Sequence, residues 1–196
     1  MSVGFADRLD GDLAALSLAG DQAAFSEVVR RHKEPLHRLV ARIIGDDDEA
    51  LDVVQDAFIA AHGALRNYDQ NRPMRAWLSR IAINKARDWR RRRAVRRLIS
   101  AVLPLSDADR TADDTPSVET VVGDRQELAE VEAAIAGLPS NLREALVLRT
   151  IEGRSQAEAA ETLGVSEKAV ETRLYRARQK LSERVGSNEI RQMSGA

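Results

Sequence analysis

Two groups of polar side chains in this sequence have the types and spacing needed to bind nucleic acid. The first group lies in a predicted helix that starts near Trp77, on the face opposite its apolar residues. Its members are Arg80, Asn84, Arg87, Asp88 and Arg91, at spacings of four, three, one and three. Arginine attracts phosphate, and asparagine and aspartate add directional hydrogen bonds. This face therefore predicts specific contact with nucleic acid, against the simpler alternative of a solvated cationic face.

The second group follows a predicted helix-turn-helix motif near the end of the chain. A helix from Ser155 to Leu163 precedes Gly164, which permits a tight turn, and Ser166 can cap a second helix that runs to about Val185. Such a motif places the first turns of its second helix in the major groove of DNA. The residues expected to contact DNA are Ser166, Lys168, Thr172, Arg173 and Arg176. The alternative is that these cations are ordinary solvated charges.

The composition favours helices as the elements that position these groups. Of the 196 residues, 43% are hydrophobic, 31% are charged and only 4% are aromatic, and Ala, Leu, Arg and Glu are abundant. The chain contains no cysteine, which excludes disulfides and cysteine-ligated zinc and fits a reducing cytoplasm. The chain does not begin with basic residues followed by an apolar run, so export is not expected. It also has no long uncharged apolar stretch, so membrane insertion is not expected. We expect an all-α, cytoplasmic protein.

The net charge of -1 conceals segments of opposite sign. Residues 72–97 hold eleven basic residues and one acid, whereas residues 105–124 hold six acids and one basic residue. The stretch from Ser100 to about Gly123 contains Pro104 and Pro116 and has no sustained periodicity, which is typical of a flexible linker. We therefore expect two small helical domains, at residues 20–96 and 125–185, joined by a linker at 97–124. Nothing after Gly186 is expected to fold.

The first domain is predicted to contain three or four helices around one core. Apolar residues at helical spacing predict a helix from about Asp21 to Ile44, with a kink or break next to Pro35. A second helix is expected to begin after Asp46 and to continue to about Leu65. The face of that helix opposite its apolar stripe carries Asp52, Gln55, Asp56 and Ile59. Turn-forming residues between Asn67 and Pro73 then separate it from the basic helix.

Three stretches of the chain resemble a known family. Ala24 to Leu65, followed by Met74 to Arg93 (MRAWLSRIAINKARDWRRRR), resembles region 2 of extracytoplasmic-function sigma factors, and Leu138 to Leu181 resembles their region 4. Both occur in the family's order and cover most of the chain. The resemblance implies a factor that binds core RNA polymerase and directs it to promoters. Region 2 would open the minus-ten element and region 4 would bind the minus-thirty-five element.

The family's functional residues can be transferred to matching positions. The resemblance places Asp52, Gln55, Asp56 and Ile59 at the core polymerase interface. The loop from Asn67 to Met74 corresponds to the loop that captures unstacked bases, and Tyr68 is its one aromatic residue expected to be exposed. Together with Asn67 and Tyr68, the face that begins at Arg80 would contact the minus-ten element. The family also implies a dedicated anti-sigma factor, in a stress or envelope response.

The recognition helix departs from the family in one position. Glu171 stands where many relatives have a basic residue before the Ser or Thr and Arg pair. A carboxylate there would repel phosphate but could accept a hydrogen bond from cytosine. The minus-thirty-five preference of relatives is therefore not expected to transfer directly.

Other functional classes leave parts of the sequence unexplained. His32, His37 and His62 form no recognised catalytic or metal site, so neither an enzyme nor a cofactor or small-molecule substrate is expected. A stand-alone helix-turn-helix regulator would account for the second domain only, and would bind specific DNA tightly without polymerase. A sigma mimic that only binds an anti-sigma factor would not need two DNA-facing sets of cations.

Overall fold

The computed structural model describes residues 4–102 and 131–194, with side chains described for residues 4–98 and 131–184. Within these ranges every regular element is helical, which confirms the all-α prediction. The first half contains η1 (Phe5–Asp7), α1 (Asp10–Leu18), α2 (Gln22–Ile44), α3 (Asp47–Gly63), η2 (Leu65–Asn67) and α4 (Met74–Val102). After a helical segment at residues 131–136, the second half contains α6 (Ser140–Leu146), the short π-helix η3 (Val147–Ile151), α7 (Gln156–Leu163) and α8 (Glu167–Ser194).

Short-range capping interactions fix the boundary between α2 and α3. Asp21 accepts hydrogen bonds from the first turn of α2, and Gly45 ends that helix with φ +76°. The Asp46 side chain then accepts from the main-chain N–H of Glu49 and caps α3. A kink or a break was expected near Lys33 and Glu34, and the structure shows no break, because α2 is one continuous helix from residue 22 to 44. Proline removes one hydrogen bond there, and the buried apolar stripe on both sides of it keeps the helix packed.

Three helical segments extend beyond the sequence-based expectation. Helix α1 lies outside the predicted first domain, yet it buries Leu13 and Ala14 against the core. Helix α4 continues to Val102, so the predicted boundary at residue 96 falls inside it, because no glycine or proline occurs before Pro104. Helix α8 continues to Ser194, so the expectation that no folded segment follows Gly186 was wrong. The remaining linker residues, 103–124, lie outside the described ranges.

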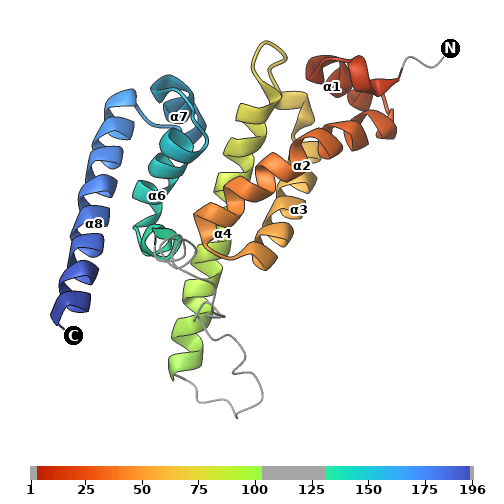
Figure 1. Cartoon of the computed structure of the whole chain (residues 1–196). Helices are drawn as coiled ribbons and strands as arrows, with labels where there is room; N and C mark the ends of the chain where they lie inside the picture. The colour runs from red at the N-terminus through yellow and green to blue at the C-terminus, as the bar shows by residue number, and fades with distance from the viewer. Residues whose placement is uncertain (1–3, 103–130, 195–196) are drawn as a thin grey trace.

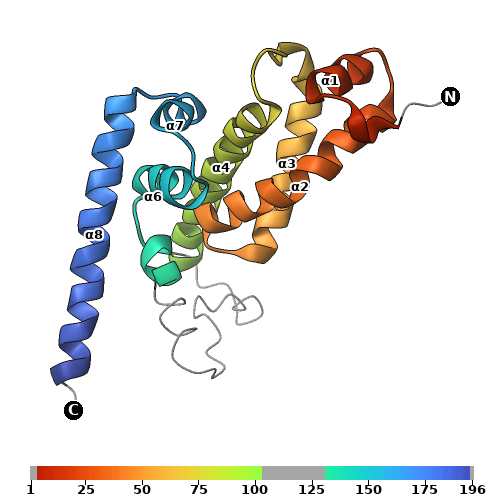
Figure 2. The same ribbon diagram turned by 45° about the horizontal axis from the view of Figure 1, so that its top comes forward.

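The two halves of the chain are in contact. Figures 1 and 2 show α6 and α7 between α4 on one side and α8 on the other, with the N- and C-termini at opposite ends of the molecule. Buried residues of the first half, such as Leu78 and Ala82, form one contiguous apolar cluster with Leu148, Ala159 and Leu163 of the second half. A smaller cluster that includes Leu142 and Ala177 packs α8 against α6.

Candidate nucleic-acid interface

The five polar residues of α4 lie on one surface, as their spacing predicted. Arg80 and Asn84 are exposed, and the Arg91 side chain is 79% exposed and forms an ion pair with Asp88. Arg87 donates a hydrogen bond of 3.1 Å to the Asn84 side chain. The helix therefore carries a row of cations interspersed with amide and carboxylate groups, an arrangement suited to phosphates and base edges.

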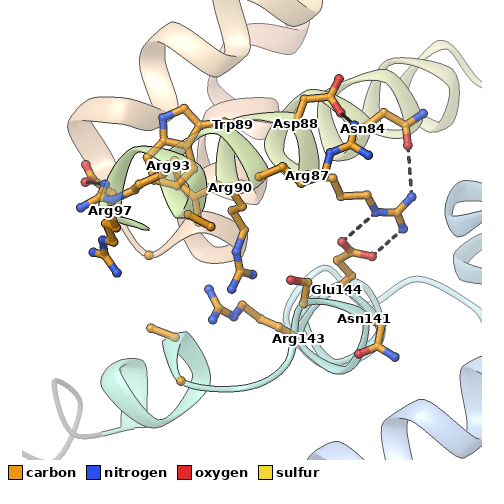
Figure 3. Close-up of a pocket in the computed structure, with 18 of the residues that line it drawn as sticks. Asn84, Arg87, Asp88, Trp89, Arg90, Arg93, Arg97, Asn141, Arg143 and Glu144 are labelled. Carbon is orange, nitrogen blue, oxygen red and sulfur yellow. Dashed lines mark hydrogen bonds and ion pairs between the residues drawn. The ribbon is translucent and has the colours of Figure 1, made fainter. Parts of the chain in front are cut away.

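Arg87 is held by the second half of the chain. Its Nε and Nη2 donate to the two carboxylate oxygens of Glu144 at 2.9 and 2.6 Å (Figure 3). The Glu144 side chain is only 1% exposed, and its hydrogen bonds raise the pKa of Arg87. Sequence reasoning missed Glu144, because a glutamate in a helix next to Arg143 carries no signal that it is buried.

The predicted helix-turn-helix is formed by α7 and α8. Helix α7 begins with a capping box in which Ser155 and Glu158 each satisfy the other's main-chain N–H. Gly164 ends it with φ +67°, a conformation that favours glycine. Ser166 then accepts a hydrogen bond of 3.2 Å from the N–H of Ala169 and caps α8, as predicted. Because Val170 and Ala177 are fully buried, the rotation of α8 about its own axis is fixed.

The exposed face of α8 includes most of the predicted DNA contacts and one that sequence reasoning missed. Lys168, Thr172 and Arg176 are exposed at helical spacing, and Tyr175 lies between them with 69% of its surface exposed. Tyr175 could have been found from the same spacing. Arg173 differs from the others, because it is half-buried and lines the cleft beside α4. The face also carries Glu171, which forms an ion pair of 2.9 Å with Lys168.

A different exposed stripe runs along α3. Asp52, Gln55 and Asp56 are exposed, and Ile59 is 73% exposed although it is a large apolar residue. Leu51, which is 38% exposed and precedes Asp52, was not predicted as part of this surface. The opposite face of α3 is buried in the core. An acidic surface with an exposed isoleucine is suited to a protein partner rather than to DNA.

The comparisons with known proteins identify both halves. Residues 28–96 match the family model described as Sigma-70 region 2, and residues 128–181 match that described as Sigma-70, region 4. The chain is 46% identical to the RNA polymerase sigma factor CnrH of Cupriavidus metallidurans, over 90% of this chain and 93% of CnrH. It is 36% identical to the ECF RNA polymerase sigma factor SigM of Mycobacterium tuberculosis, over 94% of this chain and 90% of SigM. The chain belongs to the extracytoplasmic-function sigma factors of the sigma-70 family.

Solved structures agree with this assignment. The sigma factor superposes on CnrH, whose structure was determined in complex with the cytosolic domain of CnrY, with a TM-score of 0.65 and 39% identity over 91% of this chain and 97% of that one. The Bartonella quintana sigma factor RpoE, in complex with the anti-sigma factor NepR, shares the fold, with a TM-score of 0.63 and 22% identity over 83% of this chain and 96% of that one. We use region 2 and region 4 for the two matched segments below.

The loop of region 2 differs from expectation at its aromatic residue. Tyr68 was predicted to be exposed, but it is half-buried, with its ring centroid 5.2 Å from that of Trp77. Its hydroxyl donates to the main-chain carbonyl of Arg72 at 2.7 Å, and burial raises the pKa of Tyr68. The neighbouring Asn67 is exposed. In this conformation the Tyr68 ring packs on Trp77 and its hydroxyl binds the main chain of the loop, so both ends of the side chain are held by the domain.

The histidines of the sigma factor are held in separate places. His32 lies 2.8 Å from Asp10, His37 lies 3.1 Å from the main-chain oxygen of Asp47, and His62 packs edge-on against Phe25. Among the described residues, no group of three or more His, Cys, Asp or Glu side chains could hold a metal ion. No helix within the described ranges is long and apolar enough to cross a membrane.

Proposed function

We propose that this sigma factor binds core RNA polymerase through α3, contacts the minus-ten element through α4 and its preceding loop, and contacts the minus-thirty-five element through α8. The observation that carries the proposal is the presence, in one chain, of an acidic and apolar stripe on α3 and two separate cationic faces on α4 and α8. A stand-alone regulator would need only α8 and its supporting helices. A sigma mimic would need neither cationic face.

The polymerase contact is assigned to Asp52, Gln55, Asp56 and Ile59, with Leu51 added from the structure. Exposed apolar groups surrounded by polar ones are the usual composition of a protein interface, and a few such residues supply most of the binding energy. Ile59 projects from a helix whose other face is anchored in the core, so the stripe is presented rigidly.

The minus-ten contact is assigned to Asn67, Tyr68, Arg80, Asn84, Arg87, Asp88 and Arg91. The arginines neutralise phosphates, while the Asn84 amide and the Asp88 carboxylate can discriminate base edges. Melting requires a base to leave the stack, and Tyr68 is the aromatic residue of the loop that precedes α4. Because its ring already packs on Trp77, few alternative bases are expected to be accommodated.

The minus-thirty-five contact is assigned to Ser166, Lys168, Thr172, Arg173 and Arg176, and we add Tyr175. The exposed cations Lys168 and Arg176 can bind phosphates, and Thr172 lies between them on the exposed face. Glu171 is paired with Lys168, which removes part of its repulsion of the DNA backbone and leaves one oxygen able to accept from cytosine.

Regulation by an anti-sigma factor is proposed by analogy with CnrH, whose structure holds the cytosolic domain of CnrY. CnrH is 46% identical to this chain over 90% of this chain and 93% of CnrH. Such control fits a factor that is active only under stress, such as an envelope response, and that works in the cytoplasm where RNA polymerase is found. The function is regulatory and needs neither catalysis nor a cofactor.

The polymerase assignment is tested by measuring the affinity of core RNA polymerase for the labelled chain in a competition assay. Ile59→Asp is expected to weaken binding at least about tenfold, or about 1.4 kcal/mol, because a carboxylate replaces the central apolar contact. Leu18→Asp is the matched control, since Leu18 is 53% exposed on α1, away from the stripe. Equal affinities for Ile59→Asp, Leu18→Asp and the parent chain would remove α3 from the interface.

A further inference from the structure

Three glutamates of region 4 form ion pairs with arginines of the basic segment 72–97. Glu144 of α6 binds Arg87, and Glu161 of α7 forms an ion pair with Arg72. Glu152, which follows η3, binds Arg75 at 2.6 Å and also approaches Arg42 of α2 at 3.4 Å. The acids of one domain therefore cover part of the cationic surface of the other.

Two of these carboxylates are withdrawn from water. The side chains of Glu144 and Glu152 are 1% and 8% exposed, and a buried carboxylate is tolerated only when its charge is paired. Glu144 takes both of its hydrogen bonds from Arg87, which belongs to region 2. Its burial as an anion therefore depends on the docking of region 4 against region 2.

A carboxylate and a phosphate present paired oxygens to a guanidinium in the same way. Glu144 occupies the Nε/Nη2 edge of the Arg87 guanidinium, and the Nη1 group donates to Asn84 (Figure 3). The same two donors would make a bidentate contact with a promoter phosphate. Arg87 cannot present this edge to Glu144 and to a DNA phosphate at the same time.

We infer that region 4 is an internal competitor of promoter DNA, in which Glu144, supported by Glu152, takes the place of DNA phosphates on region 2. This inference rests on the assignment of Arg87 to DNA in the proposed function. The half-buried position of Arg173 in the cleft agrees with it, because the docked arrangement also withdraws part of α8. The apparent affinity of the free sigma factor for DNA is therefore its intrinsic affinity multiplied by the fraction of molecules that are open.

Docking also involves contacts that do not compete with DNA. Arg154 of region 4 donates to the Ser79 hydroxyl at 2.8 Å, and both side chains are buried. Buried apolar side chains of both regions belong to one cluster. Removing one carboxylate is therefore expected to shift the balance between docked and open chains rather than to separate the domains completely.

The docking step can be measured without DNA or polymerase. The chain lacks cysteine, so Ser26→Cys on α2 and Ser182→Cys on α8, both exposed, allow labelling for fluorescence energy transfer. Glu144→Gln keeps the shape of the side chain and removes its charge, and we expect it to lower the high-transfer population at least about twofold. Glu152→Gln should act in the same direction, which covers the case in which Glu144→Gln folds poorly. Glu132→Gln, an exposed acid of region 4, is the matched control and should leave transfer unchanged.

The competition is then measured with a fluorescent single-stranded DNA of mixed sequence, which reports phosphate contacts without a known promoter. Glu144→Gln should bind about threefold to tenfold more tightly than the parent chain, whereas Glu132→Gln, with the same charge change, should differ less than twofold. Equal gains for both variants, or unchanged energy transfer in Glu144→Gln and Glu152→Gln, would overturn the inference. A chain that opens as expected but never supports transcription would instead disprove the proposed function.

Discussion

Arg143 of α6 donates a hydrogen bond to the main-chain carbonyl of Ile43, 2.7 Å away and 100 residues earlier in the chain. That carbonyl lies in the last turn of α2, where no helical N–H is available to pair with it. The same guanidinium donates to the carbonyl of Leu138 at 3.1 Å. Burial, together with the nearby Arg90, lowers the pKa of Arg143 to about 10. A cation of region 4 thus completes the end of a helix of region 2.

Replacing this guanidinium should uncouple the two regions. Arg143→Met keeps most of the side-chain volume but leaves two buried carbonyls without their donor, which is expected to cost about 1–3 kcal/mol. Both tryptophans, Trp77 and Trp89, lie in region 2, whereas far-UV circular dichroism reports all helices. In urea, the two signals should unfold together in the parent chain and separately in Arg143→Met. Arg178→Met, at an exposed position of α8, should preserve the single transition, and coincident curves for Arg143→Met would contradict the coupling.

Two glycines should respond in opposite directions to substitution by alanine. Gly45 has φ +76°, and a Cβ there would lie 3.2 Å from the Cβ of Ala136, so Gly45→Ala should lose at least about 1 kcal/mol of unfolding free energy. Gly63 ends α3 with a negative φ, and a Cβ there would meet nothing within 4 Å. Gly63→Ala should therefore gain about 0.5 kcal/mol from helix propensity. Thermal unfolding of both variants tests this, and a stable Gly45→Ala would show that the turn and the contact are not strained.

The N-terminal segment should depend on the ionised form of Glu27. Hydrogen bonds from Arg30 and Arg31 lower the pKa of Glu27 to about 2, and Arg31 also donates to the main-chain carbonyls of Phe5 and Arg8. Because the folded-state pKa lies below the ordinary value of 4.5, the stabilisation is complete above that value and is lost as the pH falls towards 2.

Glu27→Gln tests this dependence. Its unfolding free energy should be lower than that of the parent chain near pH 7, and the difference should shrink as the pH falls from 4.5 towards about 2. Glu34→Gln changes the same charge at an exposed position of α2 and should show neither effect. A difference that stays constant with pH would mean that the carboxylate is not the group responsible.

The exposed face of α8 should dominate the affinity for duplex DNA from the gene's own upstream region. Arg176→Ala should weaken binding and reduce the slope of log affinity against log salt by about one, because one phosphate contact is lost. Tyr175→Ala should weaken binding with little change in that slope, because no charge is removed. Lys180→Ala, an exposed cation two turns beyond Thr172, is the control for charge alone. An equal change of slope for Lys180→Ala would mean that the contact is not localised to the first turns.

Much of the fold follows from local sequence chemistry. The C-terminal ends of α2 and α7 were predictable from Gly45 and Gly164, and the start of α3 was predictable from Asp46. Each of these residues caps a helix through contacts within one turn. Helix α1 was missed because Leu9, the N-cap residue before it, provides no side-chain cap and its apolar pattern is short. The extension of α4 was missed because a run of arginines looks like a surface segment, although arginine is a good helix former.

The candidate site was predictable only where it depends on helical spacing. The exposed rows on α3, α4 and α8 follow from periodicity, and the structure shows most of their members exposed. The positions of Tyr68 and Arg173 depend on packing partners that lie elsewhere in the chain, namely Trp77 and the cleft beside α4. Likewise, the burial of Glu144 is created by contact between regions separated by more than 50 residues. No local pattern distinguishes such an acid from one in solvent.

Run-off transcription tests the central claim most directly. Core RNA polymerase and the purified chain are combined with DNA from upstream of its own gene. Arg87→Ala changes the cationic face of α4, and Thr172→Ala changes that of α8. Arg178→Ala, at an exposed position of α8, is the control. A sigma factor should yield promoter-specific transcripts that require the chain, weaken with either variant and persist with the control. Absence of transcripts and of core polymerase binding, with tight binding of a specific DNA fragment by the chain alone, would contradict the account and indicate a stand-alone regulator.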